Sequence, residues 1–458
     1  MTPRGGQRDI AITVEPSGPT ALSKLQLRAG VERPPISQAT RNALELPTDQ
    51  PIVMTGHQAA WWHAGILAKY MACQAIANCA EAAPSWVMPD QDVSDYAFLE
   101  APIKDNEGRW KRERIDLTEG ESAVPAASAS TLSGHMRLRG FESLPSVESG
   151  MHRLLAALER THVRDSAALQ VSDTLTELMA PQVDPAPVVF ASRLHQSTGF
   201  CELVERLKSE ARQATQIYND AARAIPQARV SPLARDEAAN QFELPLWRLR
   251  RGQFRRPVFS HELDDIPISE IAPRALLLTG FMRLHMCDLF IHGTGGGVYD
   301  QITERWLSDW LGASLAPILV VSATLRLPLG DGAPPAEDID RAVWAAHHAR
   351  HHPAVLGQTD LESQRESFVN AIEKARSEQH DPAPFFQQLH DLLREYRETN
   401  APKLKSLQDE AASLVSRRDE ALLASDRTWP FFFHEQDALN QLRERLESSI
   451  CSTAAGVS

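Results

Sequence analysis

Several polar residues directly follow the first strongly apolar run of the chain. The run 51–55, Pro-Ile-Val-Met-Thr, predicts a buried strand. At its end and beyond it stand Thr55, Gly56, His57, Gln58 and, six residues after His57, His63. In open α/β sheets, ligands bind beyond the carboxyl ends of the strands, where an imidazole or an amide can hold a phosphate or a carboxylate. We therefore predict a ligand-binding site here. The alternative is a strand-to-helix turn whose polar groups satisfy one another.

A second polar cluster, Asp90-Gln91-Asp92, follows another short apolar run, 85–89. Two carboxylates at this spacing could bind a divalent cation, accept a hydrogen bond from an amine, or act as a general base. The alternative is a solvated acidic turn that caps a helix. We predict Asp90 and Asp92, together with His57, to be the catalytic residues.

Four glycines stand in the segment 293–297, Gly-Thr-Gly-Gly-Gly, between a predicted strand and a predicted helix. Such a segment leaves backbone N–H groups free to face an anion at the start of the helix. It is not a Walker loop, and it fails the dinucleotide pattern G-x-G-x-x-G because Val298 occupies the third glycine position. A bound nucleotide is therefore compatible with the segment but not established by it. The predicted ligand-binding residues here are Gly293, Gly295, Gly296, Gly297 and Tyr299.

Four histidines between residues 347 and 352 have a spacing that can bind metals. On a helix, His347 with His351 and His348 with His352 would form i, i+4 pairs. No carboxylate or cysteine completes a recognised zinc pattern nearby, and an exposed helix end explains the cluster as well. We predict no metal site. Nucleophilic catalysis has no support either, because there is no G-x-S-x-G elbow.

The elements that must position these residues follow a strand–helix–strand order. A predicted helix at 61–82 separates the strands 51–55 and 85–89, and this βαβ unit indicates a parallel sheet with a right-handed crossover. Further strands are predicted at 187–192, 288–292 and 316–323, and further helices at 200–224, 273–286 and 299–311. Residues 1–50 are expected to be an extended lead-in with at most one short helix, and about 105–182 an insertion outside the sheet. We therefore predict an α/β fold whose core domain spans 1–335.

The second predicted domain, 336–425, is helical. Its apolar residues recur mostly at spacings of three and four, with charged residues between them, which is typical of a coiled coil or a helical hairpin. The stripe consists of Leu389, Leu393, Leu404, Leu407 and Leu414. A short hairpin buries only part of such a stripe, so we predict a homodimer through this region. The aromatic run 428–434 predicts that the last segment, 426–458, docks back onto the core.

Charge and composition exclude several classes of protein. The 458 residues include 47 Lys and Arg against 60 Asp and Glu, a formal net charge of −13. This balance argues against binding to nucleic acids or to anionic membranes, which require a basic surface. No apolar run is long enough to span a bilayer, and we expect no secretory signal. The five cysteines are scattered and odd in number, so a disulfide framework is not expected, and a reducing cytoplasm fits best.

Three segments together resemble the bacillithiol synthase family, the cysteine-adding ligases of bacillithiol biosynthesis. The stretch from Thr55 to Lys69 looks like the family's T-G-Q-Q-A-G segment and its following helix. Residues 86–92 look like its second strand, which ends in an E-D-H-D-type cluster, and 290–299 resemble its Gly-rich loop, which is also followed by Tyr. The sequence departs from the family pattern at His57, where the family has Gln, and at Asp90-Gln91-Asp92.

The resemblance implies a Rossmann-like core, an antiparallel coiled coil, a homodimer, and ligation of cysteine to glucosaminyl malate. On this basis the chain is a ligase that joins an amino acid to an amino-sugar conjugate. The alternative is a non-catalytic or re-specialised relative that binds a nucleotide or a sugar and acts through its coiled coil. The segment His63-Ala-Gly65 is similar to part of the H-x-G-H signature of nucleotidyl transferases, but no K-M-S-K-S signature follows, so ATP use stays open.

Overall fold

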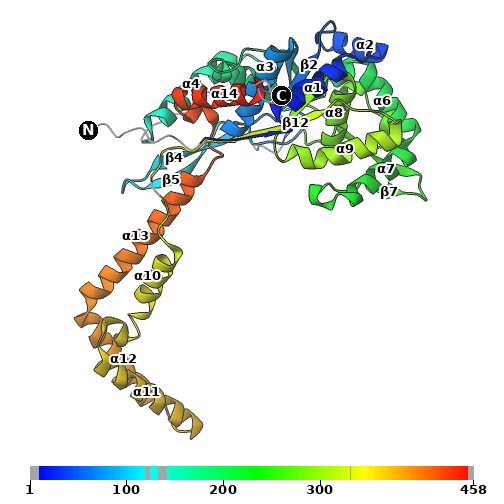
Figure 1. Ribbon diagram of the computed structural model, residues 1–458. Coiled ribbons are helices and arrows are strands. Elements are labelled where there is room, and N and C mark those ends of the chain that lie inside the picture. The colour runs from blue at the N-terminus through cyan, green and yellow to red at the C-terminus, as the bar shows by residue number, and fades with distance from the viewer. Residues whose placement is uncertain (1–9, 119–123, 133–141, 331, 452–458) are drawn as a thin grey trace, which may run out of the picture. The chain divides into compact units, whose positions relative to one another are not determined.

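A six-stranded, mostly parallel sheet forms the centre of the larger of two structural units (Figure 1). The computed structural model describes residues 10–118, 124–132, 142–330 and 332–451. The larger unit comprises the chain up to Ile103, Arg112–Leu327, and the chain from Arg427 onward. The smaller unit comprises Lys104–Lys111 and Pro328–Asp426.

The strand order of the central sheet is β1-β12-β11-β2-β3-β6, and only β1 runs antiparallel to its neighbour. The strands are β1 (Ala11–Glu15), β2 (Ile52–Gly56), β3 (Ala83–Met88), β6 (Val188–Phe190), β11 (Leu289–His292) and β12 (Ile318–Thr324). The predicted parallel pairing of the first two core strands is confirmed, with Thr55 opposite Trp86. From β2 the chain first adds strands on one side and later on the other, so the order reverses between β2 and β11.

The helix α3 (Ala64–Ala80) explains why the parallel strands read as continuous apolar runs. It follows β2 and packs on β2 and β12, and its residues Ala64–Cys73 are all buried. Strands covered on both faces need apolar residues at successive positions, and β2 is buried from Ile52 to Thr55. The same burial encloses one charged residue, Lys69.

Other helices of the larger unit lie around this sheet (Figure 1). They are α1 (Gly18–Ala29), α2 (Pro35–Ala43), α4 (Pro145–Thr161), α5 (Ala167–Met179), α6 (Thr198–Ser209), α7 (Ala211–Ala224), α8 (Ala275–Phe281), α9 (Gly296–Leu311) and α14 (Gln436–Cys451). The helix predicted at 200–224 is two helices that meet at Glu210. The helix predicted at 273–286 ends in a π-helical turn, Met282–Met286.

The N-terminal segment is more ordered than the sequence predicted. The expected lead-in contains β1, α1 and α2, and β1 pairs with β12 from Ala11 opposite Thr324 to Glu15 opposite Val320. The run 11–15, Ala-Ile-Thr-Val-Glu, is a short edge strand with partly exposed residues, and it lacks the apolar continuity that identified the central strands.

Short strands outside the central sheet occupy two further regions. The strands β7 (Arg235–Asp236), β8 (Gln241–Arg248), β9 (Arg256–Phe259) and β10 (Ile271–Pro273) form a second, antiparallel sheet, and β4 (Phe98–Lys104) pairs with β5 (Trp110–Asp116). The insertion at about 105–182 contributes no strand to the central sheet within its described residues, as predicted. Its helices α4 and α5 nevertheless have a buried face of their own, including Met151 and Leu175.

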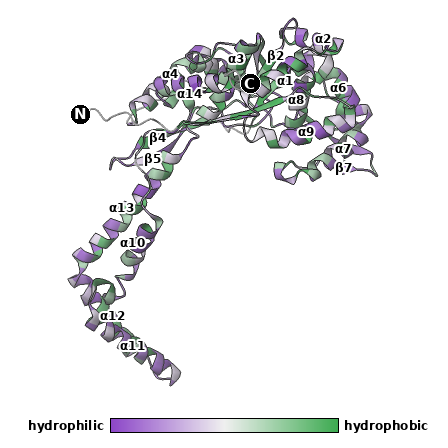
Figure 2. Ribbon diagram, viewed as in Figure 1, coloured by the Kyte–Doolittle hydropathy of each residue, from purple (hydrophilic) through white to green (hydrophobic). Residues whose placement is uncertain are grey.

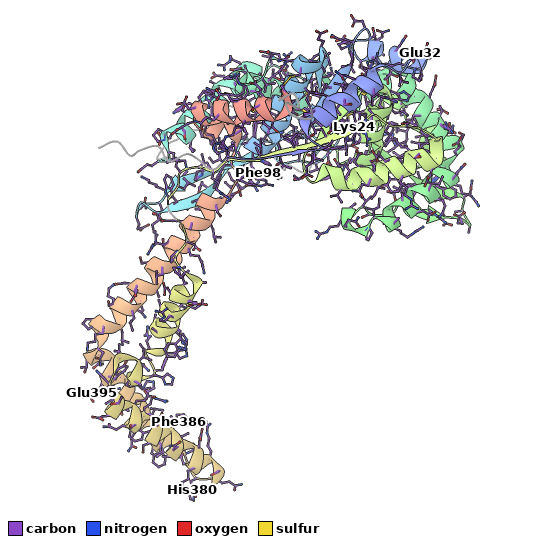
Figure 3. The ribbon with its side chains drawn as sticks, viewed as in Figure 1. Lys24, Glu32, Phe98, His380, Phe386 and Glu395 are labelled. Carbon is purple, nitrogen blue, oxygen red and sulfur yellow. A yellow bond between two sulfur atoms is a disulfide. The ribbon has the colours of Figure 1, made fainter. Side chains whose placement is uncertain are left out.

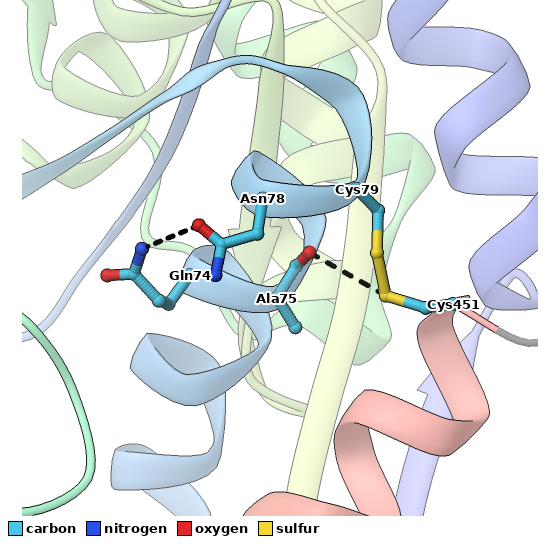
Figure 4. Close-up of a disulfide and its surroundings, with 5 residues drawn as sticks. All are labelled: Gln74, Ala75, Asn78, Cys79 and Cys451. Carbon is cyan, nitrogen blue, oxygen red and sulfur yellow. Dashed lines mark hydrogen bonds between the residues drawn. A yellow bond between two sulfur atoms is a disulfide. The ribbon is translucent and has the colours of Figure 1, made fainter.

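The segment after residue 426 packs into the larger unit. Trp429 and the three phenylalanines Phe431–Phe433 are buried, and the Phe431 amide donates to the Trp62 carbonyl oxygen at 2.7 Å. The helix α14 lies along α3. A disulfide joins Cys79 of α3 to Cys451 of α14 (Figure 4). The sequence did not predict this pairing, because the two cysteines lie 372 residues apart and only the tertiary packing brings them together.

The smaller unit contains four helices in its described part: α10 (Ala336–His348), α11 (Thr359–Ser377), α12 (Ala383–Thr399) and α13 (Ala401–Ser425). Within this unit α10 packs on α13 and α11 packs on α12 (Figure 1). Leu393 and Leu404 of the predicted stripe are buried, as is Ala411, and Asn400 separates α12 from α13 just before Pro402. Hydrophilic residues predominate along α11–α13, whereas β12 is largely apolar (Figure 2).

Within the described residues, no helix is both long enough and apolar enough to cross a membrane.

Candidate functional site

A cavity lies in the larger unit, beyond the carboxyl ends of β2 and β11. Its volume is about 590 Å³. These two strands are the neighbours between which the strand order reverses, and a crevice forms at such a point because the connections on either side lead away from it. Nine predicted site residues line the cavity: Gly56, His57, Gln58, His63, Asp92, Gly293, Gly295, Gly296 and Tyr299.

Three predicted site residues do not line this cavity: Thr55, Asp90 and Gly297. Thr55 is fully buried, and its hydroxyl donates to the Ile291 carbonyl oxygen at 2.9 Å, so it joins β2 to β11. Gly297 lies in the first turn of α9, where an added Cβ would come within 2.9 Å of the Val320 side chain. These two residues hold together the elements that border the cavity, but they do not face it.

Asp90 belongs to a different place in the fold. Its carboxylate accepts hydrogen bonds from the Ser192 amide at 2.8 Å and the Ser192 hydroxyl at 2.6 Å. It borders a separate cavity of about 390 Å³, which Arg193 and His195 also line. Burial raises the pKa of Asp90 to about 6 against the hydrogen bonds from Ser192. The prediction that both carboxylates meet in one site is wrong, because Asp90 turns toward the segment after β6 while Asp92 faces the cavity.

The glycines of the segment 293–297 are explained by close packing and not by unusual backbone angles. None of its glycines has a positive φ. An added Cβ at Gly296 would lie 2.4 Å from His292 Nδ1, whereas at Gly295 it would meet nothing within 4 Å. The helix α9 begins at Gly296, earlier than the predicted 299. Glycine is therefore needed at 296 for the imidazole of His292, and the open side of Gly295 leaves room for a ligand.

His292 is a cavity residue that the sequence did not single out. It is the last residue of β11, is buried, and its Nε2 lies 3.3 Å from Asp300 Oδ2. Asp300 is itself paired with the buried guanidinium of Arg283. Burial lowers the pKa of His292 more than Asp300 raises it. Its position at a strand end, before the glycines, was the available signal.

Lys69 is the second cavity residue that the sequence did not single out. It stands in the middle of an apolar helix, is 4% exposed, and its Nζ donates to the Gly56 carbonyl oxygen at 2.6 Å. Burial lowers its pKa to about 7. Burial, and then the charge of Lys69, lower the pKa of His57 to about 3. A lone lysine within an otherwise apolar helical run is a signal that the sequence already contains.

Arginines line another part of the cavity wall. Arg255 pairs with Asp92 and lies over the Trp247 ring, with its guanidinium carbon 4.3 Å from the ring centroid. Arg274 lies 4.0 Å from the same centroid and pairs with Glu243. The one carboxylate among the cavity-lining residues, that of Asp92, is thus already neutralised. The lining thus contains more basic than acidic side chains, although the chain carries a net charge of −13.

The four histidines of the smaller unit lie at the end of α10 and just after it. The ring centroids of His347 and His351 are 6.4 Å apart, and His352 Nδ1 lies 3.3 Å from Glu362. Across the described residues, no group of three or more histidine, cysteine or acidic side chains is arranged to hold a metal ion.

Comparison with models of known protein families finds no match, and no curated protein is significantly similar to the chain. The geometry of the cavity and the three sequence segments that line it are therefore the features from which a function can be inferred.

Proposed function

We propose that the chain is a ligase of the bacillithiol-synthase type, which joins the carboxyl group of an amino acid, cysteine in that family, to the amine of an amino-sugar conjugate such as glucosaminyl malate. The observation that carries the proposal is the convergence, on one cavity, of residues from all three segments that resemble the family. The third segment is distant in sequence from the first two, and the adjacent parallel strands β3, β2 and β11 bring residues of all three to one edge of the sheet.

The sheet supports a Rossmann-like core as part of this proposal. Numbering the parallel strands in chain order from β2 gives the order 3-2-1-4-5 from β6 to β12, which is that of the doubly wound dinucleotide-binding sheets. In those sheets the ligand lies at the point of reversal, where this cavity lies. The proposal further includes a coiled coil in the smaller unit and a homodimer of the whole chain. The disulfide between Cys79 and Cys451 argues against the cytoplasmic location, which was expected from cysteines without a disulfide framework.

The charge of the cavity suits the proposed substrate. Glucosaminyl malate carries two carboxylates, and the cavity presents Lys69, Arg255, Arg274 and Arg427. Amide formation requires that the amine lose a proton and that the carboxyl oxygen leave. Activation by a nucleoside triphosphate would let that oxygen depart on phosphate. A nucleotide is the cofactor class that the Gly-rich segment at the start of α9 suits.

A second function is favoured by the state of the acidic residues. Asp90 is turned away, and Asp92 is paired with Arg255, so the predicted carboxylate bases do not face a substrate freely. A non-catalytic or re-specialised relative would bind a nucleotide or a sugar in the same cavity and act through its helical unit. Binding without turnover is the outcome that distinguishes this alternative from the ligase.

The test is a coupled binding and turnover experiment. The purified chain is incubated with glucosaminyl malate and cysteine, with and without ATP and Mg²⁺, and the condensation product is sought by mass spectrometry. We expect product in the wild-type protein and its loss in Arg274→Met, whose guanidinium lines the cavity. Saturable binding of the sugar conjugate without product would reject the ligase and support the alternative. Neither binding nor product would reject both.

A further inference from the structure

The cavity contains a buried ammonium group without a counter-charge. Lys69 takes part in none of the ion pairs found within the described residues, and its one hydrogen bond is to the Gly56 carbonyl oxygen. An ammonium group has three donors, so two remain. Burying a charge without an opposite charge is strongly unfavourable. A position of this kind is stable when the amine is neutral or when an anion joins it.

His57 offers a second unused donor or acceptor beside Lys69. Its Nδ1 is buried and has no hydrogen-bond partner among the described residues. The charge of Lys69 acts on both His57 and His292, so the three basic groups lie close to one another. An added Cβ at Gly293 would lie 3.8 Å from Lys69 Cδ, so the Gly-rich segment borders the same space.

The elements packed around Lys69 supply no free negative charge. The segment between β2 and α3 contributes His57 and His63, β11 contributes His292, and β12 contributes the neutral Ser322. The carboxylate behind His292, that of Asp300, is held by the buried Arg283. Among the described residues, Lys69 and His57 therefore lack a negatively charged partner.

We propose that Lys69 and His57 form an oxyanion subsite beside Gly56 and Gly293, which takes a carboxylate or phosphate group of the ligand and takes up a proton as it does so. The inference rests on the proposed function only in taking this cavity as the ligand site; it does not require that ligation occur. The ligand class is a molecule with an exposed carboxylate or phosphate, small enough to enter the 590 Å³ cavity.

The proton uptake follows from the sign of the shift at Lys69. Because burial holds its pKa at about 7, most of the free protein carries a neutral amine at pH 8. An anion at hydrogen-bond distance favours the ammonium form and raises the pKa again. Binding at pH 8 should therefore take up close to one proton, and binding below pH 6 should take up almost none. His57, with a pKa of about 3, would remain largely neutral over this range.

The test is isothermal titration calorimetry at pH 8 with sulfate and with succinate, in two buffers of different ionisation enthalpy. Neither probe titrates near pH 8, so any proton taken up comes to the protein. We expect at least one probe to bind with uptake approaching one proton. Tighter binding of sulfate would indicate a phosphate group in the natural ligand, and tighter binding of succinate a carboxylate.

Two substitutions at Lys69 distinguish the effect of its positive charge on affinity from the effect of its protonation on proton uptake. Lys69→Met should weaken binding by roughly 10- to 100-fold, as expected for a lost charged hydrogen bond, and abolish proton uptake. Lys69→Arg should bind without uptake, because arginine stays charged. Because methionine suits a buried position in an apolar helix, the melting temperature of the Lys69→Met protein should exceed that of the wild type at pH 7. The matched control is Arg427→Gln, also in the cavity wall, which should weaken binding but keep the proton count.

Binding of both probes without proton uptake in the wild-type protein would overturn the proposal, as would unchanged affinity in Lys69→Met or no binding at millimolar concentrations. The wild-type proton count does not depend on any variant folding. Failure of the ligation assay leaves this result untouched, and successful ligation without uptake would reject the oxyanion subsite alone.

Discussion

At the scale of single residues, the glycines after β11 have separate tasks. Gly296 admits the imidazole of His292, and Gly297 admits the Val320 side chain of β12. Gly295 touches nothing within 4 Å on the side where a Cβ would stand, and its φ of −69° suits any residue. A run that reads as one motif therefore divides into glycines required by packing and a glycine that borders the open cavity.

The first prediction contrasts two of these glycines. Gly295→Val should leave the melting temperature unchanged and weaken binding of a nucleotide or sugar phosphate by at least roughly tenfold, about 1.4 kcal/mol, because the side chain enters the space left for the ligand. Gly296→Ala should lower the melting temperature, because its Cβ would collide with His292. Titration and thermal melting of both variants check this. Equal affinity in Gly295→Val and the wild type would contradict it.

The second prediction concerns the buried carboxyl of Asp90. Its pKa in the folded protein is about 6 against an ordinary 3.8, so the folded state holds a proton that the unfolded state releases between these values. The stabilisation is complete below pH 3.8 and is lost as the pH rises to 6. The corresponding change is about 3 kcal/mol at most.

Urea unfolding of the wild type and of Asp90→Asn between pH 4 and 7 measures this effect. As the pH rises, the wild type should lose stability relative to Asp90→Asn. The difference in unfolding free energy between the two proteins should become constant above about pH 7. Parallel stability profiles would show that Asp90 titrates normally. The comparison of two proteins removes the contribution of the other carboxylates.

At the scale of elements, the continuous apolar strands were the predictable part of the fold. The runs 51–55, 85–89 and 288–292 are buried on both faces and match β2, β3 and β11 within about two residues. The edge strand β1 and the small sheet of β7–β10 were not predicted, because β1 and β7 are partly or fully exposed and the buried β10 is only three residues long. The break at Glu210 between α6 and α7 was missed because the apolar spacing continues across it.

The site was predictable to the extent that strand ends reveal it. Residues that follow β2 and β11 converge as expected, because parallel strands end on one edge of the sheet. The direction in which Asp90 turns, and the contribution of Lys69 from a helix, depend on packing between segments distant in sequence. Neither the register of β3 against β6 nor the depth of α3 can be read from local spacing.

The third prediction concerns the disulfide between α3 and α14. Cys451→Ser should lower the free energy of unfolding by about 2–4 kcal/mol, because the crosslink restricts a long loop of the unfolded chain. The matched control is Cys201→Ser, a free cysteine of α6, which should change stability little. Denaturant unfolding with and without dithiothreitol is the measurement. A reductant effect that persists in Cys451→Ser would place the sensitive bond elsewhere.

At the scale of the whole molecule, the helical unit uses much of its apolar stripe internally. Leu393 and Leu404 are buried among its own helices. Apolar side chains that remain exposed include Trp344 of α10, Leu422 of α13 and Phe386 of α12, which Figure 3 labels. If the chain dimerises through this unit, these exposed side chains are better candidates for the contact than the buried leucines.

The fourth prediction is that the intact chain is a dimer at micromolar concentration, and that Trp344→Glu combined with Leu422→Glu yields a folded monomer. Their side chains are 53% and 62% exposed, so the charges should leave the unit itself intact. Light scattering coupled to size exclusion measures the mass, and circular dichroism confirms the helices. Leu404→Glu is the contrasting variant and should unfold the helical unit. A monomeric wild-type protein would contradict the prediction.

The packing of residues 427–451 on α3 has a consequence for how the protein is made. Ribosomes synthesise chains from the N-terminus at roughly 5–20 residues per second, so the apolar face of α3 exists for tens of seconds before α14 and the buried aromatic turn can cover it. The helical unit is synthesised entirely within that interval. The nascent chain therefore exposes this apolar face until residues 427–451 have been synthesised, and we expect chaperones to protect the incomplete core during that interval.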